Sequence, residues 1–363
     1  MMRYAYLQRG FSLVELMVGL VIGLIATLVI AQVYSTFEGL KRTTTGGADA
    51  QTNGTIALYS IQRDAGNAGF GLPVSDSTVN VLNCPLGTAI DPDGAGALAA
   101  IDIFPVAVTD GGAGAGNSDS VTFRFGAGAY NMGTAVTKIS SVTGTSLAVS
   151  NSLACKNGDA AIVMNGTLAC NSAVVNGIPD AAHVSLTAAP AAAVAGASIA
   201  CLGQGLSPSG LQNAWNELIY SIAGNQLVLT QNGVASNIAS DIVNIQVQYG
   251  ISAVASQDTI ANWVDATGAT WGTTAITPTV TNRNRIKAIR IAVVARNGEL
   301  EKTNVTNACS SLTTASPTGL CAWAGTATDP APAIDVSNDA NWQRYRYRVF
   351  TAIIPLRSLI WPL

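Results

Sequence analysis

The chain has 363 residues, of which 11% are charged, and its net charge is −3. This length is sufficient for a sizeable hydrophobic core, and the charge excludes a basic tail that binds polyanions. Polarity comes mainly from Gly, Ser, Thr and Asn, which favour turns, loops and strands.

The first element is a short polar leader followed by an apolar segment that covers residues 11–31. An apolar run of about twenty residues is long enough to cross a membrane as a helix. The run contains one carboxylate, Glu15, and an ionisable group inside lipid is costly enough to indicate a function. The leader contains Arg3 and Arg9 and no acidic residue, which favours a cytoplasmic N-terminus.

The start of this segment resembles the processing site of type IV prepilins in the eight residues Arg9-Gly10-Phe11-Ser12-Leu13-Val14-Glu15-Leu16. The resemblance implies cleavage after Gly10, methylation of the new N-terminal Phe11, and retention of the apolar helix. It also implies that Glu15 pairs with the N-terminal amine of a neighbouring subunit, which would stabilise the anion in lipid and fix the register. The alternatives are a signal peptide cut after Ala31 and an uncleaved anchor.

The apolar pattern predicts one long helix over residues 11 to about 66. Its middle, residues 43–47, is expected to be weakened, because each glycine costs about 1 kcal/mol relative to alanine. A second apolar stripe follows, made of Ile56, Leu58, Tyr59 and Ile61. The resemblance to pilins implies that the first half of the helix packs in the fibre core and that the second half packs on a globular head.

From residue 67 onward the chain is expected to be a β-rich head. Alternating apolar and polar residues predict strands, and the Gly224-Asn225 pair predicts a hairpin turn. The predicted strands and hairpins cover residues 120–125, 138–149, 216–230, 241–251, 287–296 and 343–354. The region of about 84–210 contains stretches rich in Gly and Ala, and we expect a loop-rich insertion there rather than a second catalytic domain.

The chain resembles the PilW family of type IV minor pilins at the exit of its long helix and near its C-terminal end. The resemblance lies in residues 285–296, in Tyr345-Arg346-Tyr347-Arg348-Val349-Phe350 with residues 354–357, and in residues 61–64 leading to 69–71. It implies an α+β pilin-like fold, with a long N-terminal helix packed on an antiparallel sheet head with long loops. The expected division is a leader (1–10), a helix (11–66, with 11–31 transmembrane) and a head (67–363).

Six cysteines lie beyond the membrane segment: Cys84, Cys155, Cys170, Cys201, Cys309 and Cys321. An even number in an exported head favours disulfides. Cys309 is expected to pair with Cys321, because both lie in one polar loop between two predicted strands. Cys155 is then expected to pair with Cys170, which leaves Cys84 with Cys201 by elimination.

Enzymatic and metal-binding interpretations have little support. A Ser-His-Asp triad or a zinc site would have to use His183, the single histidine, which is expected in a surface loop. Residues 111–116 are glycine-rich but lack the Lys-Ser/Thr of a phosphate-binding loop. Asp91-Pro92-Asp93-Gly94 resembles part of a calcium loop without its later ligands, so a solvated turn is favoured and calcium stays open. We therefore expect no catalysis, cofactor or metal.

Two rows of basic residues on predicted strands could form a positive stripe for DNA phosphates. The rows are Arg344, Arg346 and Arg348, and Arg283, Arg285 and Lys287. The acidic net charge favours the alternative of ordinary two-faced strands, whose basic side chains contact acidic groups and carbonyls of other subunits. Four late tryptophans could fill the core or anchor a subunit interface: Trp263, Trp271, Trp323 and Trp342.

These features imply a minor pilin that is processed by prepilin peptidase and initiates or caps a type IV pilus, supporting adhesion and twitching motility. It would lie in the bacterial inner membrane, with a cytoplasmic N-terminus and periplasmic head, and then in the surface pilus. Expected partners are other minor pilins, a tip adhesin and the pilus assembly machinery. The alternatives are a J-type minor pseudopilin of a type II secretion system and a tip adhesin or DNA-binding subunit.

Overall fold

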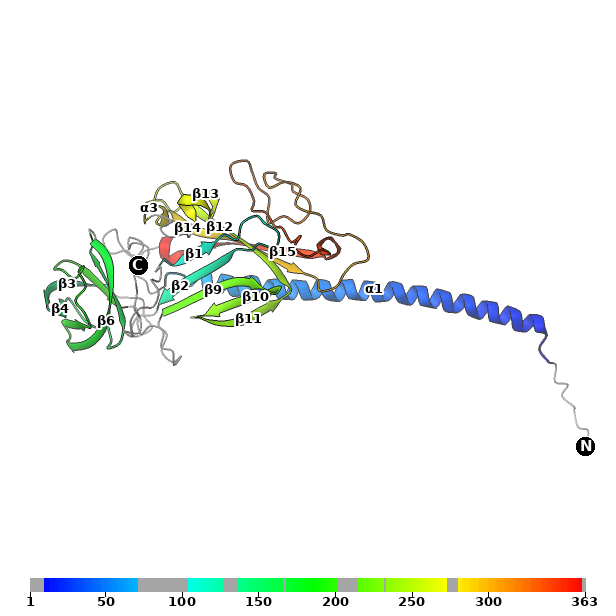
Figure 1. Ribbon diagram of the computed structural model, residues 1–363, viewed down its shortest axis with the longest axis horizontal. Helices are drawn as coiled ribbons and strands as arrows, with labels where there is room; N and C mark the ends of the chain where they lie inside the picture. The colour runs from blue at the N-terminus through cyan, green and yellow to red at the C-terminus, as the bar shows by residue number, and fades with distance from the viewer. Residues whose placement is uncertain are drawn as a thin grey trace, which may run out of the picture.

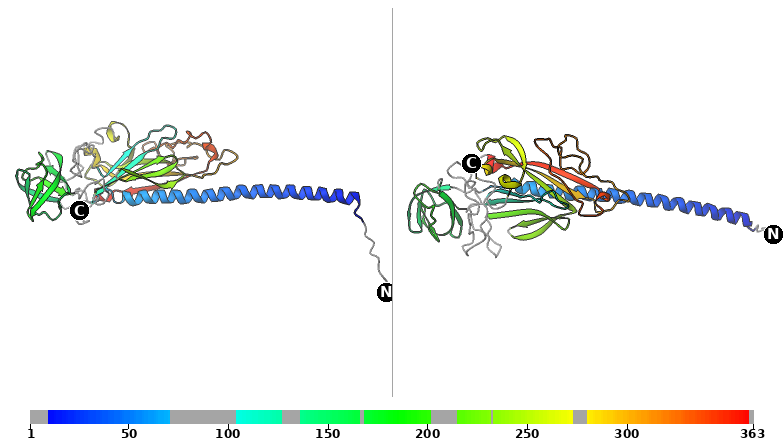
Figure 2. Two further views of the ribbon diagram at one scale, coloured as in Figure 1. Left: turned by 60° about the horizontal axis from the view of Figure 1, so that its bottom comes forward. Right: turned by 45° about the horizontal axis from the view of Figure 1, so that its top comes forward.

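The computed structural model describes residues 10–70, 104–126, 136–165, 168–201, 215–231, 233–272 and 280–360. One long helix runs along a β-rich head and projects beyond it (Figure 1). A small barrel lies at the end of the head farthest from the N-terminus, in all views (Figure 2). The predicted α+β fold, with a long N-terminal helix and an antiparallel β-rich head, is therefore confirmed.

The described helices are α1 (Leu13–Ala65), α2 (Gly268–Trp271), α3 (Val280–Arg283) and α4 (Arg357–Ile360), with a 3-10 turn at Trp342–Arg344. One sheet has the order β1 (Val106–Thr109), β2 (Ser120–Gly126), β9 (Trp215–Ala223), β10 (Gln226–Gln231) and β11 (Val234–Ser240). The other has the order β13 (Ile260–Asp265), β12 (Ile242–Ser252), β14 (Ile286–Arg296) and β15 (Tyr347–Pro355). The closed barrel is β3 (Val136–Thr143), β4 (Ser146–Val149), β7 (His183–Leu186), β6 (Leu168–Asp180), β5 (Ala160–Asn165) and β8 (Ser198–Cys201).

Helix α1 is unbroken, although its middle was predicted to be weakened. The reason is a tertiary contact: Gly46 packs so closely on the buried Asn297 that a Cβ atom would lie 1.8 Å from Asn297 Oδ1. Contact with the head therefore requires a residue without a side chain at this position. The packing offsets the low helix propensity of glycine.

The face of α1 that packs on the head is made mostly of small residues. The buried positions recur every three or four residues, at Gly46, Ala50, Gly54, Ala57, Ile61 and Ala65. Small side chains let α1 approach β14 and β15 closely, and the ring of Phe350 fills the space beside Gly54. Helix and both sheets thereby share one hydrophobic core.

The apolar stripe predicted in this half of the helix is only partly buried. Ile61 is buried and Leu58 is partly buried, but Ile56 and Tyr59 are 43% and 64% exposed. The prediction gave weight to large apolar residues, whereas the contact uses glycine and alanine. Ile56 and Tyr59 consequently remain on the surface of the isolated subunit.

The hairpin predicted over residues 216–230 is present as β9 and β10, which pair from Ala223 with Gln226. Gly224 and Asn225 form its turn with φ angles of 58° and 60°. Both residues of a type I′ turn need positive φ, which Gly and Asn tolerate. The strands predicted at 120–125, 241–251 and 287–296 are β2, β12 and β14.

The region expected to be a loop-rich insertion contains the barrel. Its strands β4, β7 and β8 have four residues each, too few for a clear alternation. Short strands rich in Ala and Ser still form a closed core, in which Ile139, Leu147, Val163, Leu186 and Ile199 are buried. The barrel therefore has a hydrophobic core of its own.

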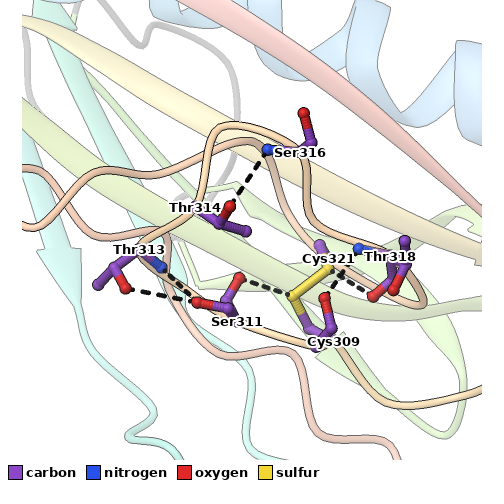
Figure 3. Close-up of a disulfide and its surroundings, with 8 residues drawn as sticks. Cys309, Ser311, Thr313, Thr314, Ser316, Thr318 and Cys321 are labelled. Atoms are coloured by element: carbon purple, nitrogen blue, oxygen red, sulfur yellow. Dashed lines mark hydrogen bonds between the residues drawn. A yellow bond between two sulfur atoms is a disulfide. The ribbon is translucent and has the colours of Figure 1, made fainter.

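Two disulfides lie among the described residues. Cys309 is bonded to Cys321 as predicted, with Cα atoms 4.8 Å apart, and the bond closes a loop rich in Ser and Thr (Figure 3). Cys155 is bonded to Cys201, so the predicted pairs of Cys155 with Cys170 and of Cys84 with Cys201 are wrong. The cause is the barrel: β8, which ends at Cys201, pairs with β5 and so returns to the loop of Cys155. Cys84 lies outside the described residues.

Candidate processing and assembly site

The helix start brings the predicted processing and assembly residues together. Phe11 is 85% exposed and precedes the first helical residue, Leu13. Ser12 and Glu15 form a capping box, in which Ser12 N donates to Glu15 Oε2 (2.9 Å) and Glu15 N donates to Ser12 Oγ (3.1 Å). The reciprocal bonds satisfy two backbone N–H groups that a helix start leaves without partners.

This cap leaves the Glu15 carboxylate at the positive end of the helix dipole. Its second oxygen, Oε1, makes no hydrogen bond to any residue that the structure describes. Gly10, Phe11 and Glu15 lie within one helical turn of the predicted cleavage point. The site can therefore offer one carboxylate oxygen to a cation from outside the chain.

The apolar half of α1 packs against no other described part of the chain. Its most apolar window has a mean hydropathy of 2.7 and is 0% buried. Among the described residues, α1 is the one helix long and apolar enough to cross a membrane. Exposed apolar surface of this extent requires lipid or other subunits to cover it.

The other end of α1 is tied to the head by polar contacts. Tyr220 Oη donates to Asp64 Oδ2 (2.5 Å) and to the Ser60 carbonyl (3.2 Å), and Arg63 Nε donates to Asp64 Oδ1 (2.7 Å). Burial and the bond to Asp64 raise the pKa of Tyr220, and Asp64 raises the pKa of Arg63. The helix therefore cannot rotate freely against the head.

A buried carboxylate joins the two sheets. Asp119 Oδ1 accepts from Gly111 N (2.9 Å), Asp119 Oδ2 accepts from Val247 N (2.7 Å), and Asp119 N donates to the Ile245 carbonyl (2.9 Å). Burial, only partly opposed by these backbone bonds, raises the pKa of Asp119 to about 7. Sequence analysis did not identify this residue, because an Asp before a strand is common in turns.

The two basic rows do not form a phosphate-binding stripe. Arg344 lies in the 3-10 turn and Arg283 lies in α3, where it is buried. The others have local partners: Arg346 binds Glu301 (2.7 Å), Lys287 binds Asp258 (3.2 Å), Arg348 donates to Gln51 (2.8 Å), and Arg285 stacks on Trp271. These partners all lie within the subunit, whereas the alternative expected contacts with other subunits.

The four tryptophans in the C-terminal part of the chain are half-buried and pack within the head: Trp263, Trp271, Trp323 and Trp342. Arg290 lies between two of them, with its guanidinium 4.8 Å from the Trp263 ring and 4.2 Å from the Trp323 ring. Burial lowers the pKa of Arg290. Since Trp323 follows Cys321, this stack fastens the disulfide-closed loop to the second sheet.

The described residues contain no group of three or more His, Cys, Asp or Glu side chains that could hold a metal ion. His183 lies at the start of β7 rather than in a loop, and its Nδ1 is 2.8 Å from Asp180 Oδ1 at the surface. The residues of the possible calcium loop, Asp91-Pro92-Asp93-Gly94, lie outside the described residues, as do Arg3 and Arg9.

An apolar helix that projects from an antiparallel head, with a carboxylate at its start, defines a pilin-like subunit. Residues 6–31 match the model of the prokaryotic N-terminal methylation motif, and residues 220–358 match the model of type IV pilus-assembly protein W. No curated protein and no solved structure gives a significant match. The two matches support a PilW-like pilin of the type IV pilus, a family of structural rather than catalytic proteins.

Proposed function

We propose that prepilin peptidase cuts this pilin between Gly10 and Phe11, that Phe11 is then methylated, and that the mature protein joins other minor pilins to initiate and cap a type IV pilus. The observation that carries the proposal is the helix start, where Glu15 keeps one oxygen without a partner among the described residues. The match to the methylation motif over residues 6–31 supports the processing step.

The lipid around the helix start explains why Glu15 would need a partner from another subunit. A carboxylate in lipid is costly unless an opposite charge compensates it. The amine of Phe11 from a neighbouring subunit is such a charge, and it can reach the depth of Glu15 if the two helices are offset by about 6 Å, the rise of four helical residues. Pairing would align the helices of the two subunits and let their exposed apolar faces pack.

The position of the barrel supports a place at the tip of the pilus. The barrel lies beyond the end of the head that is opposite the apolar helix (Figure 1). A subunit in the shaft must leave room for further subunits above its head, and a terminal subunit has no such limit. We keep the division into a head from about residue 67 and an insertion at about 84–210, which holds the barrel, as part of this proposal.

In this proposal the subunit lies in the inner membrane before assembly, with its head in the periplasm, and on the cell surface afterwards. Adhesion and twitching motility would depend on it because they require pili. Deletion of the gene is expected to reduce the number of surface pili. Unchanged piliation would contradict the proposal, and loss of type II secretion with intact pili would indicate the J-type pseudopilin instead.

A pair of variants separates the charge of Glu15 from its capping role. Glu15→Gln keeps an oxygen for the capping box and removes the charge, whereas Ser12→Ala removes the cap and keeps the charge. In a deletion strain, Ser12→Ala is expected to restore pili and Glu15→Gln to fail, at equal levels of membrane protein. Equal restoration by both variants would contradict the pairing of Glu15 with the Phe11 amine.

A further inference from the structure

A groove lies between α1 and the head just beyond the apolar part of the helix. Residues 34–36, 38 and 39 of α1 line one side, and residues 299–303 line the other. Its volume is about 670 Å³. The loop after β14 lies beside α1 at the end of the head from which the apolar helix projects (Figure 1).

The height of the groove above the hydrocarbon core of the membrane can be estimated from the rise of helix α1. The apolar run ends at Ala31, and each helical residue adds about 1.5 Å. Tyr34 therefore lies about 5 Å above the edge of the hydrocarbon, and Gly39 lies about 12 Å above it. The headgroup layer is about 5–8 Å thick on each side of a bilayer, so the groove begins within this layer.

The loop that forms the outer wall is held firmly. Arg344 Nε donates to the Glu301 carbonyl (2.8 Å), Glu301 N donates to the Arg344 carbonyl (2.8 Å), and Arg346 Nε donates to Glu301 Oε1 (2.7 Å). With Glu301 bound to the head, the exposed residues on either side of it are Leu300, which is 43% exposed, and Lys302. Ordering this loop at a surface would cost little further entropy.

The exposed groups suit the surface of a bilayer. Tyr34 and Phe37 are 71% and 66% exposed, and aromatic side chains concentrate at membrane interfaces. Glu299 and Lys302 offer a carboxylate and an ammonium, which complement the amine and the phosphate of a zwitterionic headgroup. Leu300 adds an apolar side chain that can enter the interface.

We propose that the loop of residues 299–305, together with Tyr34 and Phe37, is a membrane-docking surface that binds phospholipid headgroups and holds the head of the unassembled subunit against the bilayer. The surface continues the membrane-spanning part of α1, and the inference rests on the proposed membrane insertion alone, not on a place in the pilus. Assembly would then require this contact to be released as the subunit leaves the membrane.

The test uses the full chain in nanodiscs of phosphatidylethanolamine and phosphatidylglycerol, with photoreactive benzoylphenylalanine placed at Leu300. Val234 is the matched control, since it is apolar and 72% exposed but lies far from the span. Strand β11 ends at Ser240, whose hydroxyl accepts a hydrogen bond from Asn53 of α1. Val234 lies at the opposite end of the same strand, six residues away, beside the β10–β11 turn. A third probe at Ile25 reports insertion of the helix.

We expect the Leu300 and Ile25 probes to gain the mass of one phospholipid, and the Val234 probe to gain none. Lys302→Glu is expected to lower the yield at Leu300 several-fold, while Lys156→Glu on the barrel leaves it unchanged. Adducts at Ile25 without adducts at Leu300, or adducts from Leu300 to a second protein copy, would overturn the docking surface and leave insertion intact. Absence of adducts at Ile25 would overturn insertion and the inference together.

Discussion

The hydroxyl of Tyr220 on β9 donates a 2.5 Å hydrogen bond to Asp64 near the last turn of α1. The Tyr220 ring also packs edge-to-face on Phe123 of the neighbouring strand β2, with ring centroids 6.1 Å apart. A single side chain thus connects the end of the long helix with the interior of the first sheet. Because Asp64 is 4% exposed, its carboxylate depends on these bonds for compensation.

Tyr220→Phe keeps the ring and removes the hydroxyl. We expect it to lower the free energy of unfolding by about 1.5–3 kcal/mol, the usual cost of losing a hydrogen bond to a buried charged group. Urea unfolding of the full chain in detergent measures the loss. Tyr59→Phe, at a position 64% exposed, is the matched control and is expected to change stability by less than about 0.5 kcal/mol.

Two glycines of α1 should respond oppositely to alanine. At Gly54 a Cβ atom would lie 2.0 Å from Phe350 Cε2, whereas at Gly47 it would meet nothing within 4 Å. Gly54→Ala is expected to destabilise the contact between helix and head by about 1–3 kcal/mol through overpacking. Gly47→Ala is expected to stabilise the protein by up to about 1 kcal/mol through helix propensity. Thermal unfolding distinguishes them, and a shift in the same direction for both would contradict the packing.

Asp119 should make stability depend on pH. Its pKa in the folded protein is raised to about 7, so between about pH 4 and pH 7 the folded state binds more protons than the unfolded state. The free energy of unfolding is therefore expected to fall as pH rises through this window, by at most about 1.4 kcal/mol per pH unit from this group. In Asp119→Asn this part of the slope should vanish, and equal slopes for both proteins would contradict it.

The disulfide pattern can be read from peptides of the unreduced protein. We expect the peptide of Cys155 to be joined to that of Cys201, and the peptide of Cys309 to that of Cys321. Replacing Cys155 and Cys201 with serine should destabilise the barrel by about 2–5 kcal/mol. A link between Cys155 and Cys170 in the mass spectra would contradict the arrangement of β5 beside β8.

The sequence was most informative where local pattern decides the structure. The long helix, the Gly224-Asn225 hairpin and the strands β2, β12 and β14 follow from apolar periodicity and turn chemistry. The capping box at Ser12 and Glu15 is local as well, although it was not predicted, and it includes the predicted assembly residue Glu15.

The errors arise where distant contacts decide. Residues 343–346 alternate like a strand, but β14 ends at Arg296, which pairs with Tyr347, so no partner strand is left for them. The helix continues through Gly46 because Asn297 packs on it. Cys155 meets Cys201 only because the barrel closes, which short strands rich in Ala and Ser did not indicate.

The most direct test of the central claim is the mass of the N-terminal peptide of the protein isolated from membranes or pili. The account predicts a chain that begins at Phe11 and carries one methyl group on its amine, with residues 11–31 retained. A chain that begins at Met1, or one that begins after Ala31, would contradict the assignment of this helix to pilus assembly.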